Sequence, residues 1–505
     1  MNTRFYFNIP KDRNNFYLAA LGCLVVFFGI YLIFSVLFSS NDNDFDDDNV
    51  TILKHTHAFI HSAYYYQKSE TLGDNAIALV MSINKLTAEN ILDMNIKLLA
   101  TNETLDRFPV KASLTSEHRF NGSCEYVTVL AQANTIENMG RLEIQGGNRV
   151  IDKLLFKKPL ETSPSKVVFC VAPQLGAENW QEFLRQVHVA KRYGAHLHIY
   201  VISMVEKYFR LMKEYESLGY ISLEPWLTVK YSHVRERVDE PNKNIEILQR
   251  TSAFTDCILN YKEAAEFVGS IEMEDLLFPI GSTSYYEEFE KQYDGSYLYS
   301  ALTYARQTLL IPQTAEDSIS VSSLFETVLA GDVSSYGRSF VRTSNYNSTW
   351  LHWSRNSDLI PREIQGNVTY LQHKQVEGCR IFNFKKADIG NDTRTEVIMD
   401  DKILAEIEEE LKSHLELPQI KKLMAHLPRN KLYSPIFERC FETLTSSVSP
   451  QETVCMDMYS CELPRREDVP CIHSDGLYSS MIPMRPITYH YSSEHFFSRN
   501  IGCNV

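Results

Sequence analysis

Residues 267–279 have the sequence Phe-Val-Gly-Ser-Ile-Glu-Met-Glu-Asp-Leu-Leu-Phe-Pro. The apolar run at 267–271 predicts a strand that is buried on both faces. Three acids, Glu272, Glu274 and Asp275, follow it directly. Acids next to a buried strand must be paired or must bind a cation. The alternative interpretation is an acidic corner between a strand and a loop.

The spacing of these acids suits a divalent cation. Glu272 and Glu274 are alternate residues, so both can face one crevice at the carboxyl end of the strand. Open α/β sheets bind ligands outside those strand ends. Oxygen ligands suit Mg²⁺ or Mn²⁺, and such an ion can hold a diphosphate as it leaves. We therefore predict Glu272 and Glu274 as metal ligands.

Strands and helices are predicted to alternate around this motif. Apolar runs at 166–171, 196–202, 220–224 and 266–271 predict strands, and helical spacing covers 177–193, 205–218 and 244–262. This order indicates a mostly parallel sheet with crossover helices on both faces, an α/β fold of the Rossmann-like kind. The sequence has no G-x-G-x-x-G or Walker loop, so dinucleotide and ATP sites have no support. The layout is that of a nucleotide-sugar-binding half-domain.

Composition excludes one large class of partner. The 505 residues carry 50 Lys plus Arg against 64 Asp plus Glu, a net charge of −14. Nucleic-acid binding needs a basic surface, so we expect no nucleic acid. A metal could still neutralise a nucleotide-sugar diphosphate locally.

The N-terminal region predicts a membrane anchor. Residues 16–38 carry no charge and are long enough to span a bilayer as a helix; a cleaved signal peptide would have a shorter apolar core. Arg4, Lys11 and Arg13 precede the stretch and place residues 1–15 in the cytosol. We therefore expect a single-pass type II membrane protein whose bulk is lumenal or extracellular, with an acidic stem at 39–55.

Glycosylation sequons and cysteines agree with this topology. Six sequons all follow the predicted anchor, at Asn49, Asn102, Asn121, Asn347, Asn367 and Asn391. Nine of the ten cysteines also follow it, and an oxidising lumen would allow disulfides among them. Nine is odd, so at least one thiol is free or intermolecular, and the pairing stays open.

Three regions are expected beyond the stem. Residues 56–160 contain β-like segments and predict a small β-rich unit. Residues 165–430 form the predicted catalytic domain, and residues 431–505 a cysteine-containing tail tied by disulfides. Within the catalytic domain, Glu287, Glu288 and Glu290 are expected on a solvated face.

Several motifs resemble glycosyltransferase family 92, the domain-of-unknown-function-23 group. The opening Phe-Cys-Val-Ala-Pro at 169–173 with Glu178-Asn179-Trp180 is similar to the family's, as are Gln249, Asp256-Cys257 and the acidic block. The stretch at 57–65 resembles the family's strand before the catalytic domain. The resemblance covers residues 57–430 and implies a GT-A-like fold, a Golgi setting and a metal-dependent enzyme.

The resemblance also implies a reaction and further site residues. The expected reaction transfers a hexose, galactose in known cases, from a UDP-sugar to a glycan acceptor with inversion. Pro173, Gln249 and Asp256 are then donor-binding candidates. His352 would complete the metal shell, with His373 as second choice; packing of His352 between Trp350 and Trp353 is the alternative. The family usually has Asp where this chain has Glu272 and Glu274.

Three functions stay open at this point. The leading one is a lumenal glycosyltransferase in which Asp275 or Asp332 deprotonates the acceptor hydroxyl; such an enzyme could also be a homodimer. The Glu-for-Asp changes motivate a second, a degenerate family member that binds glycans or a lumenal partner. The third, an adhesion or receptor ectodomain, is disfavoured by the short cytosolic tail.

Overall fold

The computed structural model describes residues 56–86, 88, 97–102, 107–116, 124–146, 149–150, 154, 156–231, 241–245, 247–293, 299–312, 317–346, 360–364, 367–386, 399–446, 455, 457–480 and 487–505. The predicted anchor at 16–38 lies outside these ranges. No helix in the described part of the chain is long and apolar enough to cross a bilayer.

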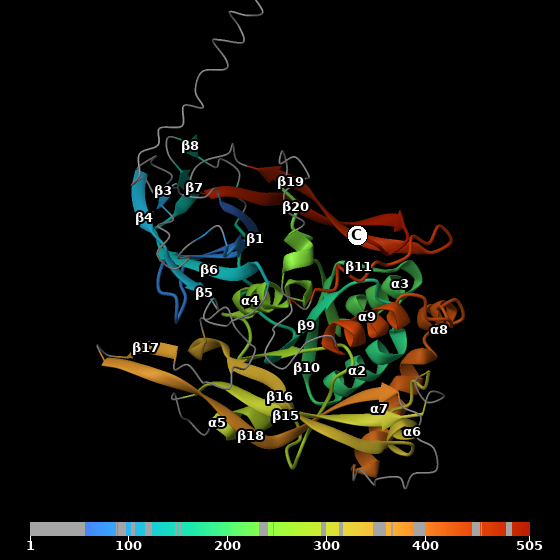
Figure 1. Ribbon diagram of the computed structural model, residues 1–505. Helices are drawn as coiled ribbons and strands as arrows, with labels where there is room; N and C mark the ends of the chain where they lie inside the picture. Colours follow the sequence, from blue (N-terminus) through green and yellow to red (C-terminus); the bar gives the residue numbers. More distant parts are fainter. Residues whose placement is uncertain are drawn as a thin grey trace, which may run out of the picture. The chain divides into compact units, whose positions relative to one another are not determined.

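A nine-stranded mixed sheet forms the centre of the fold (Figure 1). Its order is β12-β10-β9-β13-β16-β15-β18-β14, and β17 pairs with β18. The first four strands are parallel, and β16 pairs with β13 in the antiparallel direction. The bounds are β9 Val167–Gln174, β10 Ala195–Val201, β12 Ile221–Pro225, β13 Phe267–Ile271, β14 Leu276–Pro279, β15 Tyr299–Ile311, β16 Leu329–Arg342, β17 Ile360–Ile364 and β18 Asn367–Lys386.

Helices join the parallel strands as predicted. These are α2 Trp180–Arg192, α3 Glu206–Ser217 and α4 Arg250–Tyr261. The other helices of the described residues are α5 Tyr285–Tyr293, α6 Val321–Phe325, α7 Asp401–Leu415, α8 Pro418–Met424 and α9 Ser434–Ser446. The predicted strand and helix order from residue 166 to 271 is confirmed. The predicted helix at 244–262 begins later, because the short 3₁₀ segments Pro241–Asn244 and Ile247–Gln249 precede α4.

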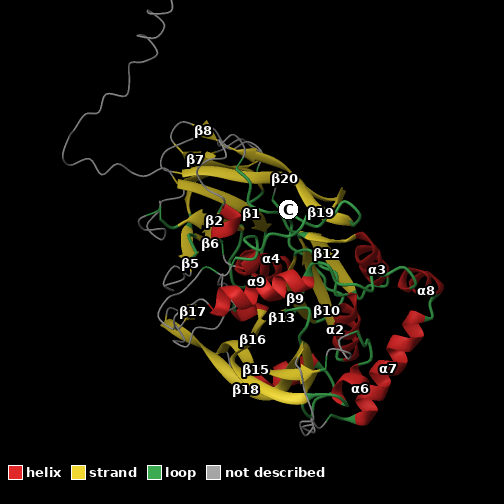
Figure 2. Cartoon of the chain, turned by 45° about the vertical axis from the view of Figure 1, so that its right-hand side comes forward, coloured by secondary structure: helices red, strands yellow, loops and turns green. Residues whose placement is uncertain are grey.

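Alternation along β9 divides the core into two layers. Val167, Phe169 and Val171 pack in one cluster with residues of α2, α3 and α5. Val168 and Cys170 face the other way and pack with α4. Successive strand side chains point to opposite faces, so a continuous apolar run supplies both layers of a sheet that is covered on both sides (Figure 2).

Two further sheets lie beyond this core. A seven-stranded sheet has the order β11-β19-β20-β1-β2-β6-β5, and a four-stranded one β4-β3-β7-β8. Their bounds are β1 Thr56–Tyr66, β2 Ala76–Asn84, β3 Lys97–Asn102, β4 Arg107–Lys111, β5 Ser113–Ser116, β6 Tyr126–Asn134, β7 Met139–Gly146, β8 Arg149–Val150, β11 Ser203–Val205, β19 Pro470–Ser480 and β20 Ile487–Ile501.

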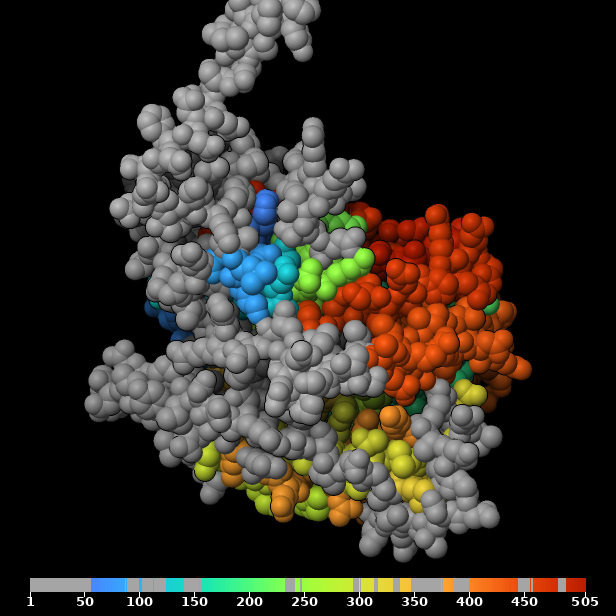
Figure 3. Space-filling view, viewed as in Figure 1, coloured from blue at the N-terminus to red at the C-terminus, as the bar shows by residue number. Residues whose placement is uncertain are grey.

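The C-terminal strands complete the N-terminal sheet. β20 pairs with β1 in parallel, for example Ala58 with Tyr489, and in Figure 1 red strands lie beside the blue one. The β-rich region is thus not closed by its own residues. The C-terminal segments, orange to red, also form much of the right-hand surface in Figure 3.

Four disulfides occur in the described part of the chain: Cys124–Cys455, Cys170–Cys257, Cys440–Cys461 and Cys471–Cys503. Cys379 is free and buried. The predictions of disulfides and of at least one unpaired thiol are therefore confirmed.

The expectation of a solvated face on α5 is wrong for Glu288. This side chain is fully buried, and its carboxylate accepts hydrogen bonds from Ser282 Oγ at 2.9 Å and Gln292 Nε2 at 2.8 Å. Gly378 makes room for it, because a Cβ there would lie 1.5 Å from Glu288 Oε1. Hydrogen bonds to two neighbours make the burial tolerable.

Candidate functional site

The acidic motif forms a tight turn at the carboxyl end of β13. Asp275 Oδ2 accepts a hydrogen bond from the backbone N–H of Glu272 at 3.0 Å, and the Asp275 N–H donates to the Glu272 carbonyl at 3.2 Å. Upstream, Gly269 is required by packing, since a Cβ there would lie 2.2 Å from the Phe340 ring. The turn therefore follows a strand that lies tightly between β9 and β16.

Three arginines surround the motif. Arg338 of β16 forms a short ion pair with Asp275, and its Nη1 lies 3.8 Å from Glu272 Oε1. Arg306 of β15 lies 3.5 Å from Asp275 Oδ1, and Arg250, the first residue of α4, bonds Glu272 Oε1. The burial of two acids is thus compensated by cations from three separate elements.

These contacts decide what Asp275 can do. Only 1% of Asp275 is exposed, and both of its oxygens face arginines or a backbone N–H. A general base must accept a proton from a substrate hydroxyl within hydrogen-bond reach. The arrangement therefore favours a structural role for Asp275 over its predicted role as the base.

Glu274 differs from its two neighbours. It is half-buried, and among the described residues no hydrogen bond or ion pair holds its carboxyl group. Burial, and then the charges of Asp275 and Glu272, raise the pKa of Glu274 to about 8. The negative charge of Glu182, in the first turn of α2, acts in the same direction. A cation at this point would relieve the repulsion.

The backbone before α4 is strained. Leu248 and Gln249 have φ of 52° and 56°, and two successive non-glycine residues in the left-handed region cost roughly 1–2 kcal/mol each. They turn the chain into α4, where Arg250 meets Glu272. Strain of this kind is concentrated at functional sites.

Gln249 itself has an unused acceptor. Its side chain is buried and donates from Nε2 to Asn242 Oδ1 at 3.2 Å. Its Oε1 has no hydrogen-bond partner among the described residues. Pro173, the other donor-binding candidate near a strand end, is buried within β9. A buried acceptor without a donor is costly, so a ligand N–H that bonds Gln249 Oε1 would be stabilising.

Asp256 lies in a different environment from the acidic motif. It is fully buried on α4 and accepts hydrogen bonds from Tyr64 at 2.8 Å and Tyr200 at 2.6 Å. Lys157 lies 3.5 Å from it and also pairs with Glu224. These contacts join α4 to β1 and β10, so they favour a structural role over the predicted donor contact.

The side chains of the remaining candidates lie outside the described part of the structure. His352 and its alternative His373 have no described side chain, and residue 352 lies outside the described ranges. Asp332 lies on β16, and its side chain is also outside the description. Their predicted roles stay predictions.

Sequence reasoning did not find the three arginines or Glu182. Arg306 and Arg338 come from strands in the antiparallel half of the sheet, and nothing in their spacing marks them. Arg250 could have been noticed as the residue after Gln249.

Two motif residues that carry the resemblance tie the C-terminal segment to α2. The Glu178 carboxylate accepts hydrogen bonds from the three successive backbone N–H groups of 432–434, each at 2.8 Å. Trp180 Nε1 donates to the Pro428 carbonyl at 2.9 Å. A carboxylate at the start of α9 satisfies N–H groups that have no partner within the helix.

The fold and its motif define a mixed α/β protein with an acidic turn, lined by arginines, at the carboxyl end of a central parallel strand. A model of glycosyltransferase family 92 matches residues 165–415. The glycosyltransferase family 92 protein F55C10.4 of Caenorhabditis elegans is 41% identical, with 89% of this chain and 91% of that protein covered. A second, ZK381.2 of the same species, is 33% identical, with 96% and 98% covered.

The chain belongs to glycosyltransferase family 92. Among solved structures, S. aureus TarS 1-349 in complex with UDP-GlcNAc covers 59% of this chain and 82% of its own, at 10% identity and a TM-score of 0.23. That likeness is too slight to support an argument about fold or ligand.

Proposed function

We propose that this protein transfers a hexose, with galactose as the first choice, from a UDP-sugar to a glycan acceptor with inversion. Family membership supports glycosyl transfer as the general activity. The observation that supports metal dependence is Glu274: among the described residues its carboxyl group has no ion-pair partner, whereas the two neighbouring acids pair with arginines.

The residues fit a divalent ion of the Mn²⁺ or Mg²⁺ kind. Glu274 would supply a carboxylate oxygen directly, and Glu272, which is 18% exposed, would supply a second. Such an ion would neutralise the donor diphosphate and stabilise its charge as it leaves. His352 stays the proposed third ligand.

The chain's own groups would do the rest. Arg250 and Arg306 offer guanidinium groups beside the motif, and arginine is well suited to phosphate oxygens. Gln249 Oε1 would accept a hydrogen bond from a donor N–H, such as that of the uracil ring. The acceptor oxygen would bond to the anomeric carbon while the bond to the diphosphate breaks. The acceptor proton would pass to a carboxylate, for which Asp332 is the proposed residue.

Fold subtype and location belong to the same proposal. The parallel run β12-β10-β9-β13 with the acids at its end supports a GT-A-like fold. Four disulfides suit an oxidising compartment, which supports a type II protein of the Golgi lumen. A homodimer is also proposed.

Donor titration tests the function. Full-length protein in detergent should bind UDP more tightly in Mn²⁺ than in EDTA, because the acids repel the diphosphate until a cation is bound. Glu274→Gln should lose most of this difference, and Glu409→Gln, an exposed acid on α7, should keep it. Equal affinity in Mn²⁺ and EDTA would exclude this metal site. If the wild type neither binds UDP nor transfers a sugar, the result would favour the alternative that the two glutamates motivate, a degenerate protein that binds glycans.

A further inference from the structure

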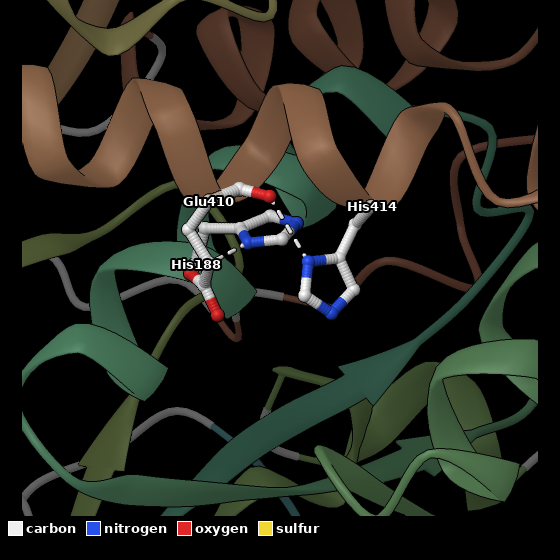
Figure 4. A group of neighbouring side chains, drawn as sticks. All are labelled: His188, Glu410 and His414. Carbon is white, nitrogen blue, oxygen red and sulfur yellow. Dashed lines mark hydrogen bonds and ion pairs between the residues drawn. The ribbon is translucent and has the colours of Figure 1, made fainter.

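Three side chains of types that can bind metal ions lie close together where α7 packs on α2. His188 of α2 faces Glu410 and His414 of α7 (Figure 4). One ligand atom from each residue lies within 4.8 Å of the others. Glu410 and His414 are four residues apart, so they share one face of α7.

The hydrogen bonds at His414 fix which nitrogen can bind a ligand. Its Nδ1 lies 3.0 Å from the Glu410 carbonyl oxygen, which can only accept. The proton is therefore assigned to Nδ1, and Nε2 presents a lone pair. The Tyr220 hydroxyl lies 2.7 Å from that Nε2 and 3.1 Å from Glu410 Oε1, but it has one proton for these two acceptors.

His188 contributes one more proton. Its Nδ1 lies 2.9 Å from Glu410 Oε2, and its Nε2 lies 2.9 Å from the Tyr215 hydroxyl. Because a carboxylate only accepts, Nδ1 carries the proton and Nε2 accepts from Tyr215. Three acceptor atoms, two of Glu410 and one of His414, thus share two protons. One of these acceptor atoms therefore has no donor among the described residues.

An ion at this position would be bound by His188 and His414 as neutral imidazoles and by Glu410 as a carboxylate. If the proton of His188 moves from Nδ1 to Nε2, Nε2 donates to the Tyr215 hydroxyl and Nδ1 can bind the ion. Histidine ligands usually donate their other ring N–H to such a neighbour.

We propose that His188, Glu410 and His414 bind one Zn²⁺ ion that fastens α7 to α2. Two imidazoles and a carboxylate are a usual Zn²⁺ ligand set, and Tyr220 or water can take the fourth position. His188 is fully buried, whereas Glu410 and His414 are half-exposed, so an ion can enter from solvent. No hydrogen bond or ion pair of the described residues joins this site to the acidic motif, and the proposal does not depend on the proposed function.

The chain offers a matched control for the test. His426, just beyond α8, is exposed, and its Nδ1 bonds the Lys422 carbonyl at 2.8 Å, as His414 bonds that of Glu410. It faces no second ligand of the group. His414→Ala and Glu410→Gln should therefore lose the ion, and His426→Ala should keep it.

Metal content and stability are measured on full-length protein after chelation, reloading with Zn²⁺ and dialysis. Wild type should retain one Zn²⁺ per chain, show a visible absorption band with Co²⁺, and gain about 3 °C in Tm at a Zn²⁺ concentration of about 100 Kd. Glu274→Gln should retain the Zn²⁺ while losing Mn²⁺-dependent UDP binding, which separates the two sites. Full Zn²⁺ retention by both His414→Ala and Glu410→Gln, or no retention by the wild type, would overturn the proposal and leave the group as a hydrogen-bond network without a metal ion.

Discussion

Replacing Glu274 by glutamine should change how stability depends on pH. Glutamine keeps the volume of the side chain and removes its titration. The pKa of Glu274 is raised from 4.5 to about 8 in the folded protein, so between these values the folded state binds a proton that the unfolded state has lost. The free energy of unfolding of the wild type therefore falls as pH rises through this window, because the native state binds more protons.

The magnitude follows from the same values. Linkage gives a slope of at most about 1.4 kcal/mol per pH unit for one group. Because Glu274 is only half-buried, solvent screens part of the effect, and we expect a total of about 2–4 kcal/mol between pH 5 and pH 8. For a folded unit of this size that corresponds to roughly 2–4 °C in Tm. The free energy of unfolding of Glu274→Gln should equal that of the wild type at pH 5 and exceed it at pH 8.

The assay is thermal and guanidinium unfolding at pH 5, 6.5 and 8 in EDTA, with Glu409→Gln as the control. The stability of the control should depend on pH in the same way as that of the wild type. A constant difference between Glu274→Gln and wild type across the three values would refute the reasoning, because the carboxyl group would then ionise at no cost. The argument for a cation at this point would fail with it.

Three further perturbations have expected outcomes. Asp275→Asn leaves Arg338 without its buried partner and should lower the free energy of unfolding in urea by roughly 3–5 kcal/mol. Lys157→Met removes the cation between the buried carboxylate of Asp256 and the half-buried carboxylate of Glu224, and urea unfolding should show that the free energy of unfolding falls by roughly 3 kcal/mol. The double variant Cys170→Ala/Cys257→Ala removes a disulfide between cysteines that are 87 residues apart. The free energy of unfolding, measured in guanidinium, should fall by about 4 kcal/mol.

The parallel half of the central sheet could be predicted from the sequence because its signals are local. Continuous apolar runs, helical spacing and the glycines that end α2 and α3 all lie within a few residues of the element they define. The acids after β13 were recognisable for the same reason. Acids at the end of a fully apolar run conflict with their surroundings, and that conflict marks a site.

The surroundings of the acids were not predictable because they depend on pairing. Arg338 reaches Asp275 only because β16 pairs with β13, and no short-range pattern sets that partnership. Glu288 shows the same limit: two adjacent acids on α5 appear equivalent in sequence, yet one is buried by contacts with Ser282 and the close approach at Gly378. Asp256 and the cysteine after it were noticed as a motif, but the two tyrosines that hold Asp256 come from other elements.

The pairing of β1 with β20 has a consequence for how the protein is made. His57 and His490, whose ring nitrogens lie 2.9 Å apart, are separated by 433 residues. At 5–20 residues per second, a ribosome needs roughly 20–90 s to pass from one to the other. Throughout that time one edge of β1 has no strand to pair with, and unpaired edges invite association with other chains. A nascent chain of this protein therefore exposes that edge until β20 emerges, and a version that stops before β20 would keep the edge open permanently.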